Sequence, residues 1–264
     1  MTSQEKAAAI SARKATLTRD TPISALTAYD YPTARLLDEA GVDILLVGDS
    51  LGMVMLGFPD TTHVTLDMMI HHTAAVARGV KRALVIGDMP IQTYATPDQA
   101  LATAQALVRA GADAVKLEGG LRQVEKVKAI VAAGIPVMGH HGMLPQRVLE
   151  EGGYKKKGKT DQESDAILEG ALALQQAGCF ALVLESVVPK VAQKITAQLN
   201  IPTIGIGCVS PSHPHTCDGE IAVITDVIGS SPWFVPPFAT TRANVAAEIT
   251  RSAKEYIEEL SSKI

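Results

Sequence analysis

Short apolar runs recur along the chain, and one of them fills the first half of residues 42–53. It is rich in Val, Ile and Leu and passes directly into Asp49 and Ser50, with a glycine on either side of this pair. A run that is apolar throughout is typical of a strand buried on both faces in a parallel sheet. Ligands of such sheets bind beyond the carboxyl ends of the strands, so we expect chemistry where this run ends.

Seven further runs predict strands of the same kind, and helical segments lie between them. The predicted strands lie in residues 23–27, 42–53, 83–88, 114–118, 135–140, 180–185, 202–207 and 221–225. The predicted helices are a short leading one, one that ends at Ala40, residues 66–78, 97–110 and 161–177, and an amphipathic C-terminal one over 241–260. This alternation predicts an α/β fold, a (β/α)8 TIM barrel that occupies residues 1–264 as a single domain. A doubly wound open sheet is the alternative, but no Gly-x-Gly-x-x-Gly pattern follows the first strand.

Composition narrows the classes of protein. The 264 residues are 47% hydrophobic, which is enough for one large core. A net charge of -4 and a pI near 6.0 give no basic surface for nucleic acid or an anionic membrane. The three cysteines follow no disulfide pattern, and no apolar run is long enough to span a bilayer. Residues 1–19 also lack the apolar segment of a secretory signal, so we expect a soluble cytoplasmic protein.

Acids stand at the ends of several predicted strands, with a hydroxyl, a lysine and a histidine beside them. These residues are Asp49, Asp88, Glu118 and Glu185, then Ser50, Lys116 and His140. In a barrel the strand ends meet at one rim, where acids repel one another unless a cation compensates them. Converging carboxylates favour Mg²⁺ over Zn²⁺. The alternative is that these acids only cap helices and form salt bridges at the rim.

The same residues suggest two different catalytic roles, that of a general base and that of a group that stabilises negative charge. Glu185 lies on a strand away from the other three acids, so it is free to serve as a general base, and an apolar strand end raises a carboxyl pKa towards neutrality. Lys116 would offset negative charge that develops on a carbonyl oxygen. The combination points to enolate chemistry on a 2-oxo acid.

Seven short motifs occur in order between residues 24 and 207. They are Val47-Gly48-Asp49-Ser50-Leu51-Gly52-Met53, His71-His72-Thr73, Val115-Lys116-Leu117-Glu118-Gly119-Gly120, Gly139-His140-x-Gly142, Pro145-Gln146, Gly152-Gly153-Tyr154-Lys155 and Leu182-Val183-Leu184-Glu185. Together they closely resemble the ketopantoate hydroxymethyltransferase family. The resemblance implies a Mg²⁺-dependent (β/α)8 enzyme of pantothenate and coenzyme A synthesis, related to the phosphoenolpyruvate mutase and isocitrate lyase group.

The resemblance also implies roles for individual residues. The implied metal residues are Asp49, Asp88 and Glu118, the last directly or through water, and the implied substrate-binding residues are Asp49, Ser50, Asp88, Lys116 and His140. Glu185 would remove the C3 proton of 3-methyl-2-oxobutanoate, and the enolate would attack the one-carbon unit of 5,10-methylenetetrahydrofolate. The family forms large homo-oligomers, so a homo-oligomer, a decamer by this resemblance, is expected.

One segment departs from the family pattern. Nine residues, 208–216, separate Gly207 from Cys217-Asp218-Gly219, and Cys208 stands where the family has a small residue. Cys208, His213, His215 and Cys217 could be read as a zinc cluster, although their spacing matches no standard pairing. Because of this loop, a related Mg²⁺-dependent 2-oxo acid aldolase or carbon-carbon lyase stays an alternative, as does an inactive 2-oxo acid-binding paralogue.

Overall fold

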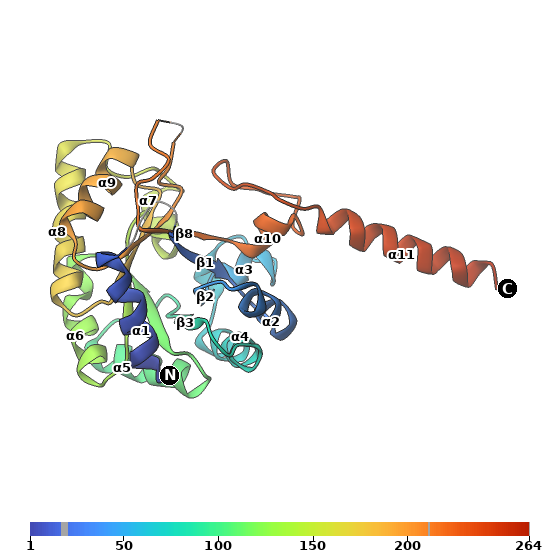
Figure 1. The fold of residues 1–264 in the computed structure, drawn as a ribbon, viewed down its shortest axis with the longest axis horizontal. Helices are drawn as coiled ribbons and strands as arrows, with labels where there is room; N and C mark the ends of the chain where they lie inside the picture. Colours follow the sequence, from blue (N-terminus) through green and yellow to red (C-terminus); the bar gives the residue numbers. More distant parts are fainter. Residues whose placement is uncertain (17–20, 211, 264) are drawn as a thin grey trace. The chain divides into compact units, whose positions relative to one another are not determined.

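The computed structural model describes residues 1–16, 21–210 and 212–263 of the chain. They form two units, Met1–Ile221 and Ala222–Ile264, which are described separately. In the first unit, parallel strands close into a barrel in sequence order (Figure 1). The strands are β1 (Ile23–Thr27), β2 (Ile44–Val47), β3 (Leu84–Asp88), β4 (Ala114–Glu118), β5 (Val137–Gly142), β6 (Ala181–Glu185), β7 (Thr203–Ile206) and β8 (Gly219–Ala222). The predicted TIM barrel is confirmed.

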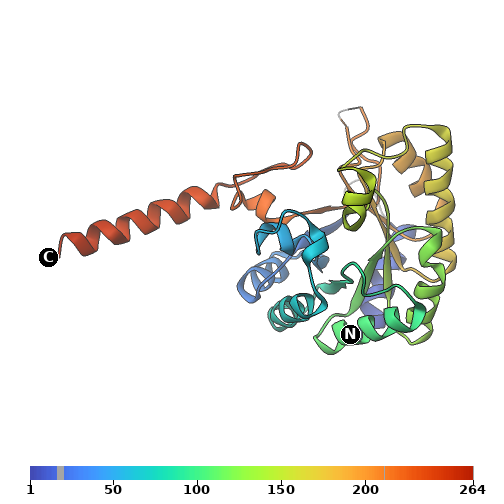
Figure 2. The same ribbon diagram turned by 180° about the vertical axis from the view of Figure 1, so that it is seen from behind.

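Helices surround this barrel, as the two opposite views show (Figures 1 and 2). They are α1 (Ser3–Ala12), α2 (Tyr31–Ala40), α3 (Leu51–Val54), α4 (Leu66–Gly79), α5 (Pro97–Arg109), α6 (Val124–Ala132), α7 (Val148–Glu151), α8 (Asp161–Gln176) and α9 (Pro189–Gln198). Side-chain caps fix several starts, because Asp30, Thr65, Thr96 and Thr160 each accept a hydrogen bond from the third backbone N–H of their helix. The predicted helices 66–78, 97–110 and 161–177 are confirmed to within one residue.

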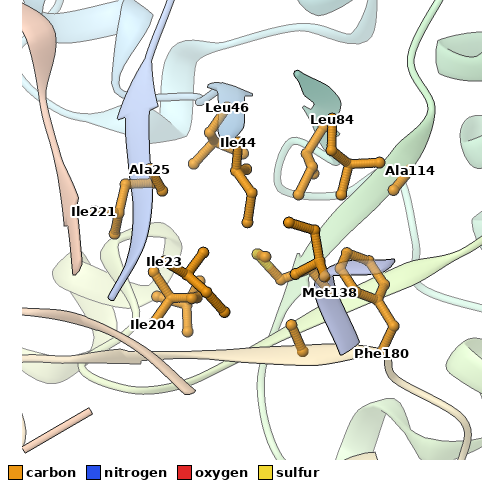
Figure 3. Packing of buried hydrophobic residues seen from close by; sticks show 14 of the residues in the cluster. Ile23, Ala25, Ile44, Leu46, Leu84, Ala114, Met138, Phe180, Ile204 and Ile221 are labelled. Atoms are coloured by element: carbon orange, nitrogen blue, oxygen red, sulfur yellow. The ribbon is translucent and has the colours of Figure 1, made fainter. Parts of the chain in front are cut away.

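Alternate residues of each strand point into the barrel and fill its lower part with aliphatic side chains. Ile44 and Leu46 of β2 meet Leu84, Met138 and Ile204 there, within one buried cluster (Figure 3). Two residues beyond Ile86, Ala114, Met138 and Val183 of this cluster, the chain carries Asp88, Lys116, His140 and Glu185. The period of two therefore places the strand-end acids above an apolar floor, inside the barrel mouth.

The amino-terminal end of the barrel is closed by α1, whose Ala7 and Ile10 belong to the same apolar cluster. Basic residues of this leading segment pair with an acid that precedes a strand: Lys6 with Asp113 at 2.9 Å and Lys14 with Asp218 at 2.8 Å. Such contacts at the bottom face of a TIM barrel serve stability, whereas the opposite face serves chemistry.

One predicted strand needs correction. The eighth strand was expected over residues 221–225, but β8 is Gly219–Ala222, and residues 224–228 form a helix, α10 (Ile224–Ile228). The strand begins at Gly219 because its pairing starts there, opposite Ile204 of β7, and the carbonyl oxygen of Asp218 accepts a hydrogen bond from the backbone N–H of Ile23 at 3.1 Å. Between β2 and α4, residues 53–65 contain the end of α3 and a 3-10 turn, η2 (Thr61–His63).

The second unit holds α10 and α11 (Val245–Ser261). Asn244 caps α11 by accepting a hydrogen bond from the backbone N–H of Ala247 at 3.2 Å. The C-terminal helix predicted over residues 241–260 is therefore confirmed, with its start moved to this cap. Within the described ranges, no helix is long and apolar enough to cross a membrane. The prediction of a single domain over residues 1–264 stays a prediction.

Candidate active site

The inward row at the carboxyl ends of β3 to β6 carries five polar side chains. They are Asp88, Lys116, Glu118, His140 and Glu185. In register, Asp88 lies beside Lys116 and Glu118 beside His140. Asp49 joins them from the turn after β2, because its backbone N–H donates to Asp88 Oδ2 at 3.3 Å. The structure thus brings six of the seven predicted residues into one group.

Lys116 supplies the positive charge of this group. Its Nζ lies 2.7 Å from Asp88 Oδ1 and 3.6 Å from Glu118 Oε1, and the side chain is 5% exposed. Burial alone would lower the pKa of Lys116, but the charges of Asp88, Glu118 and Asp49 outweigh it and raise this pKa. Lys116 therefore stays protonated and keeps a fixed charge inside the mouth.

His140 links two of the carboxylates. Its Nδ1 lies 3.4 Å from Glu118 Oε1 and its Nε2 lies 3.4 Å from Glu185 Oε2. Burial would raise the pKa of Glu118, but the nearby charges of His140 and Lys116 lower it overall. Glu118 is therefore an ionised side chain held between two basic groups.

Glu185 has a different environment from Glu118. Its side chain is 17% exposed, against 2% for Glu118, so it faces the open end of the site. Burial raises the pKa of Glu185 to about 7, and the charge of His140 offsets only part of this effect. A carboxylate with a pKa near 7 can accept a proton at neutral pH and give it back.

Asp49 and Asp88 are neighbouring buried carboxyl groups, and the pKa of each is raised. Burial, followed by the charge of Asp88, raises the pKa of Asp49 well above its usual range. Burial also raises the pKa of Asp88, and Lys116 offsets only part of that increase. One lysine thus faces several buried carboxylates, and a divalent cation would relieve the excess.

The side chains of the described residues do not form a metal site with three or more ligands. Within residues 1–16, 21–210 and 212–263, no group of three or more His, Cys, Asp or Glu is arranged to hold an ion. This argues against the zinc cluster of Cys208, His213, His215 and Cys217. It is compatible with Mg²⁺, which takes one or two carboxylates and fills its remaining positions with water and substrate.

Ser50 contacts a different partner from the charged group. It lies at the start of α3, and its hydroxyl is 2.9 Å from the hydroxyl of Tyr29. Tyr29 in turn contacts His72, whose Nδ1 lies 2.6 Å from the Tyr29 carbonyl oxygen. His72 thus has a structural contact, and Tyr29 is a neighbour of Ser50 that the sequence analysis did not identify.

Gln146 and Tyr94 were also not predicted as site residues. Gln146 belongs to the 3-10 turn η4 (Pro145–Arg147) after β5, and it contacts Asp49 and Glu118 through separate hydrogen bonds. The Pro145-Gln146 motif was a signal for it, but a neutral amide carries no charge pattern to suggest a role. Tyr94 lies in the loop after β3 and donates to the Gln146 side chain.

The sequence of this chain is similar to those of known proteins. A sequence model described as ketopantoate hydroxymethyltransferase matches residues 7–264. A 3-methyl-2-oxobutanoate hydroxymethyltransferase of Pyrobaculum arsenaticum is 52% identical over 90% of this chain and 88% of its own length. One of Thermosynechococcus vestitus is 51% identical over 92% of both chains.

Solved structures share the fold at lower identity. A 2,3-dimethylmalate lyase of the PEP mutase/isocitrate lyase superfamily superposes with a TM-score of 0.60 at 20% identity, over 99% of this chain and 88% of its own. A phosphonopyruvate hydrolase in complex with oxalate and Mg²⁺ has a TM-score of 0.60 at 15% identity, over 100% of this chain and 87% of its own. The family model and the close relatives agree with the resemblance of the motifs. The chain therefore belongs to the ketopantoate hydroxymethyltransferase family of enzymes.

Proposed function

We propose that the chain transfers a hydroxymethyl group from 5,10-methylenetetrahydrofolate to 3-methyl-2-oxobutanoate, with Mg²⁺ as cofactor and 2-dehydropantoate (ketopantoate) as product. The observation that carries this proposal is the contrast within one mouth: Glu185 has a pKa near 7, while Lys116 is held permanently charged. A proton acceptor beside a fixed cation is what enolisation of a 2-oxo acid needs.

Asp49 and Asp88 would hold the Mg²⁺, with Glu118 behind them. The fit rests on their chemistry, since both are oxygen ligands whose buried charges lack full compensation. Bound Mg²⁺ would supply Lewis-acid charge to the carboxylate and keto oxygens of the 2-oxo acid. Asp49 and Asp88 would thereby also position the substrate.

Glu185 would remove the proton from C3 of the substrate. Its position at the more exposed edge of the group leaves its carboxylate accessible, and its raised pKa matches the task at neutral pH. His140 lies 3.4 Å from it and would help to hold the substrate or the developing charge. Lys116 would stabilise the enolate oxygen without moving its own proton.

The enolate carbon would then form a bond to the one-carbon unit of the folate. Both bonds from the methylene carbon to N5 and N10 of the folate break in the overall reaction, and one water supplies the hydroxyl group. The C3 proton and the second hydrogen of that water end on the two nitrogens, so tetrahydrofolate leaves. Ser50 would contribute a hydroxyl contact at the edge of the substrate pocket. The cytoplasmic location and the homo-oligomer, a decamer by resemblance, stay predictions, and light scattering would test the latter.

Proton NMR of 3-methyl-2-oxobutanoate in D₂O tests this proposal in two stages. Loss of the C3 proton signal with protein and Mg²⁺, and no loss with EDTA, is expected for the enolising site. Ketopantoate should appear once 5,10-methylenetetrahydrofolate is added. Exchange without ketopantoate would favour an aldolase or lyase with another electrophile, and absence of exchange would favour a binding protein.

A further inference from the structure

Gln146 contacts the acidic group from three directions although it carries no charge. Its Nε2 donates to Asp49 Oδ2 at 2.8 Å and to the carbonyl oxygen of Met89 at 2.9 Å. Its backbone N–H donates to Glu118 Oε2 at 3.1 Å. One buried residue after β5 thus ties together the ends of β2, β3 and β4.

Tyr94 fixes the direction of this amide. The Tyr94 hydroxyl donates to Gln146 Oε1, and both side chains are buried. If the amide were reversed, Oε1 would face Asp49 Oδ2 and the Met89 carbonyl oxygen, which are both acceptors, while Nε2 would face a hydroxyl. All polar atoms of the Gln146 side chain are satisfied in the observed direction alone, so the amide is locked.

The locked amide decides which carboxylate oxygens are available. Oδ2 of Asp49 accepts from Gln146, which leaves Oδ1 for another partner. Oε2 of Glu118 accepts from the Gln146 backbone, and its Oε1 lies near Lys116 and His140. Asp49 is therefore prepared to offer one oxygen to the cation.

We propose that Gln146, locked by Tyr94, is a positioning residue that presents one oxygen of Asp49 to the divalent cation. This inference rests on the proposed function, because it takes the cation as given. Groups that orient metal ligands through hydrogen bonds set metal affinity even though they never touch the metal.

Binding of Mn²⁺ in place of Mg²⁺, followed by the electron paramagnetic resonance signal of the free ion, tests the inference without turnover. Gln146→Ala should weaken Mn²⁺ binding by about 10- to 100-fold. Tyr94→Phe, which removes one hydroxyl, should weaken it by about 2- to 10-fold. Gln198→Ala is the matched control, since Gln198 is exposed at the end of α9 and should leave the affinity unchanged.

The outcomes separate the two proposals. If the unaltered protein binds no Mn²⁺, the cation of the proposed function is refuted and this inference with it. If it binds Mn²⁺ and both variants bind equally well, the positioning role alone is refuted. A purely structural role would lower the melting temperature in EDTA without a loss of affinity in the folded protein. If Gln146→Ala does not fold, Tyr94→Phe decides, because an unchanged affinity in that variant refutes the positioning role.

Discussion

Replacement of Glu185 by Gln should separate stability from activity. Folding raises the pKa of this carboxyl from its ordinary 4.5 to about 7, because the site is buried. Each pH unit between these values corresponds to about 1.4 kcal/mol. Ionised Glu185 therefore lowers the free energy of unfolding by about 3 kcal/mol, and Gln, which cannot ionise, avoids this cost.

The sign of the effect fixes its pH dependence. A folded-state pKa above the unfolded one gives stability that is fully present below pH 4.5 and is lost as the pH rises through 7. In EDTA, the unaltered protein should therefore lose stability between pH 5 and pH 8, while Glu185→Gln does not lose this contribution. The free energy of unfolding of the variant should thus increase relative to that of the unaltered protein. Denaturant unfolding at both pH values measures this gain. The exposed Glu169→Gln on α8 is the control and should show no such gain.

Activity should change in the opposite direction. Loss of a general base lowers a rate by about 10²- to 10⁴-fold, so exchange of the C3 proton should fall at least 100-fold in Glu185→Gln while 3-methyl-2-oxobutanoate still binds. In the unaltered protein, exchange should rise with pH towards a plateau above 7. Exchange that survives the substitution would refute the assignment of the base. A stability difference that does not change with pH would refute the buried, raised pKa.

Three further predictions concern Lys116, the divalent cation and Asp38. Lys116→Met leaves Asp88 buried without its partner, so it should lower the free energy of unfolding in EDTA by about 3 kcal/mol and abolish exchange, as denaturation and NMR would show. EDTA should stop exchange in the unaltered protein and Mg²⁺ should restore it, whereas exchange that persists in EDTA would contradict the need for a cation. Asp38 accepts hydrogen bonds from the backbone N–H groups of Lys81, Arg82 and Ala83, so Asp38→Ala should cost about 2–4 kcal/mol of stability at pH 7. Those hydrogen bonds outweigh the effect of burial and lower the pKa of Asp38, so its contribution should be lost as the pH falls below about 4, which denaturant unfolding at pH 3 and pH 7 would detect.

The local sequence was sufficient for most of the fold. Apolar runs predicted the strands, because this signal depends on neighbours in the chain. The caps Thr65 and Thr160, which the structure shows at two helix starts, are local features as well. The eighth strand was misplaced because its start depends on backbone pairing with β7 and on the hydrogen bond between Asp218 and Ile23, which are far apart in sequence. No local pattern contains that contact.

The sequence by itself also determined which acids share the barrel mouth, since a period of two and parallel strands suffice to place Asp88, Glu118 and Glu185 at one rim. Only the tertiary structure decided how those acids differ. Burial, the distance to Lys116 and the position of His140 separate an ionised Glu118 from a Glu185 with a pKa near 7. The contacts of Gln146 likewise exist only in the folded chain. Electrostatic energies depend on distance and burial, and neither quantity is set until residues remote in sequence meet.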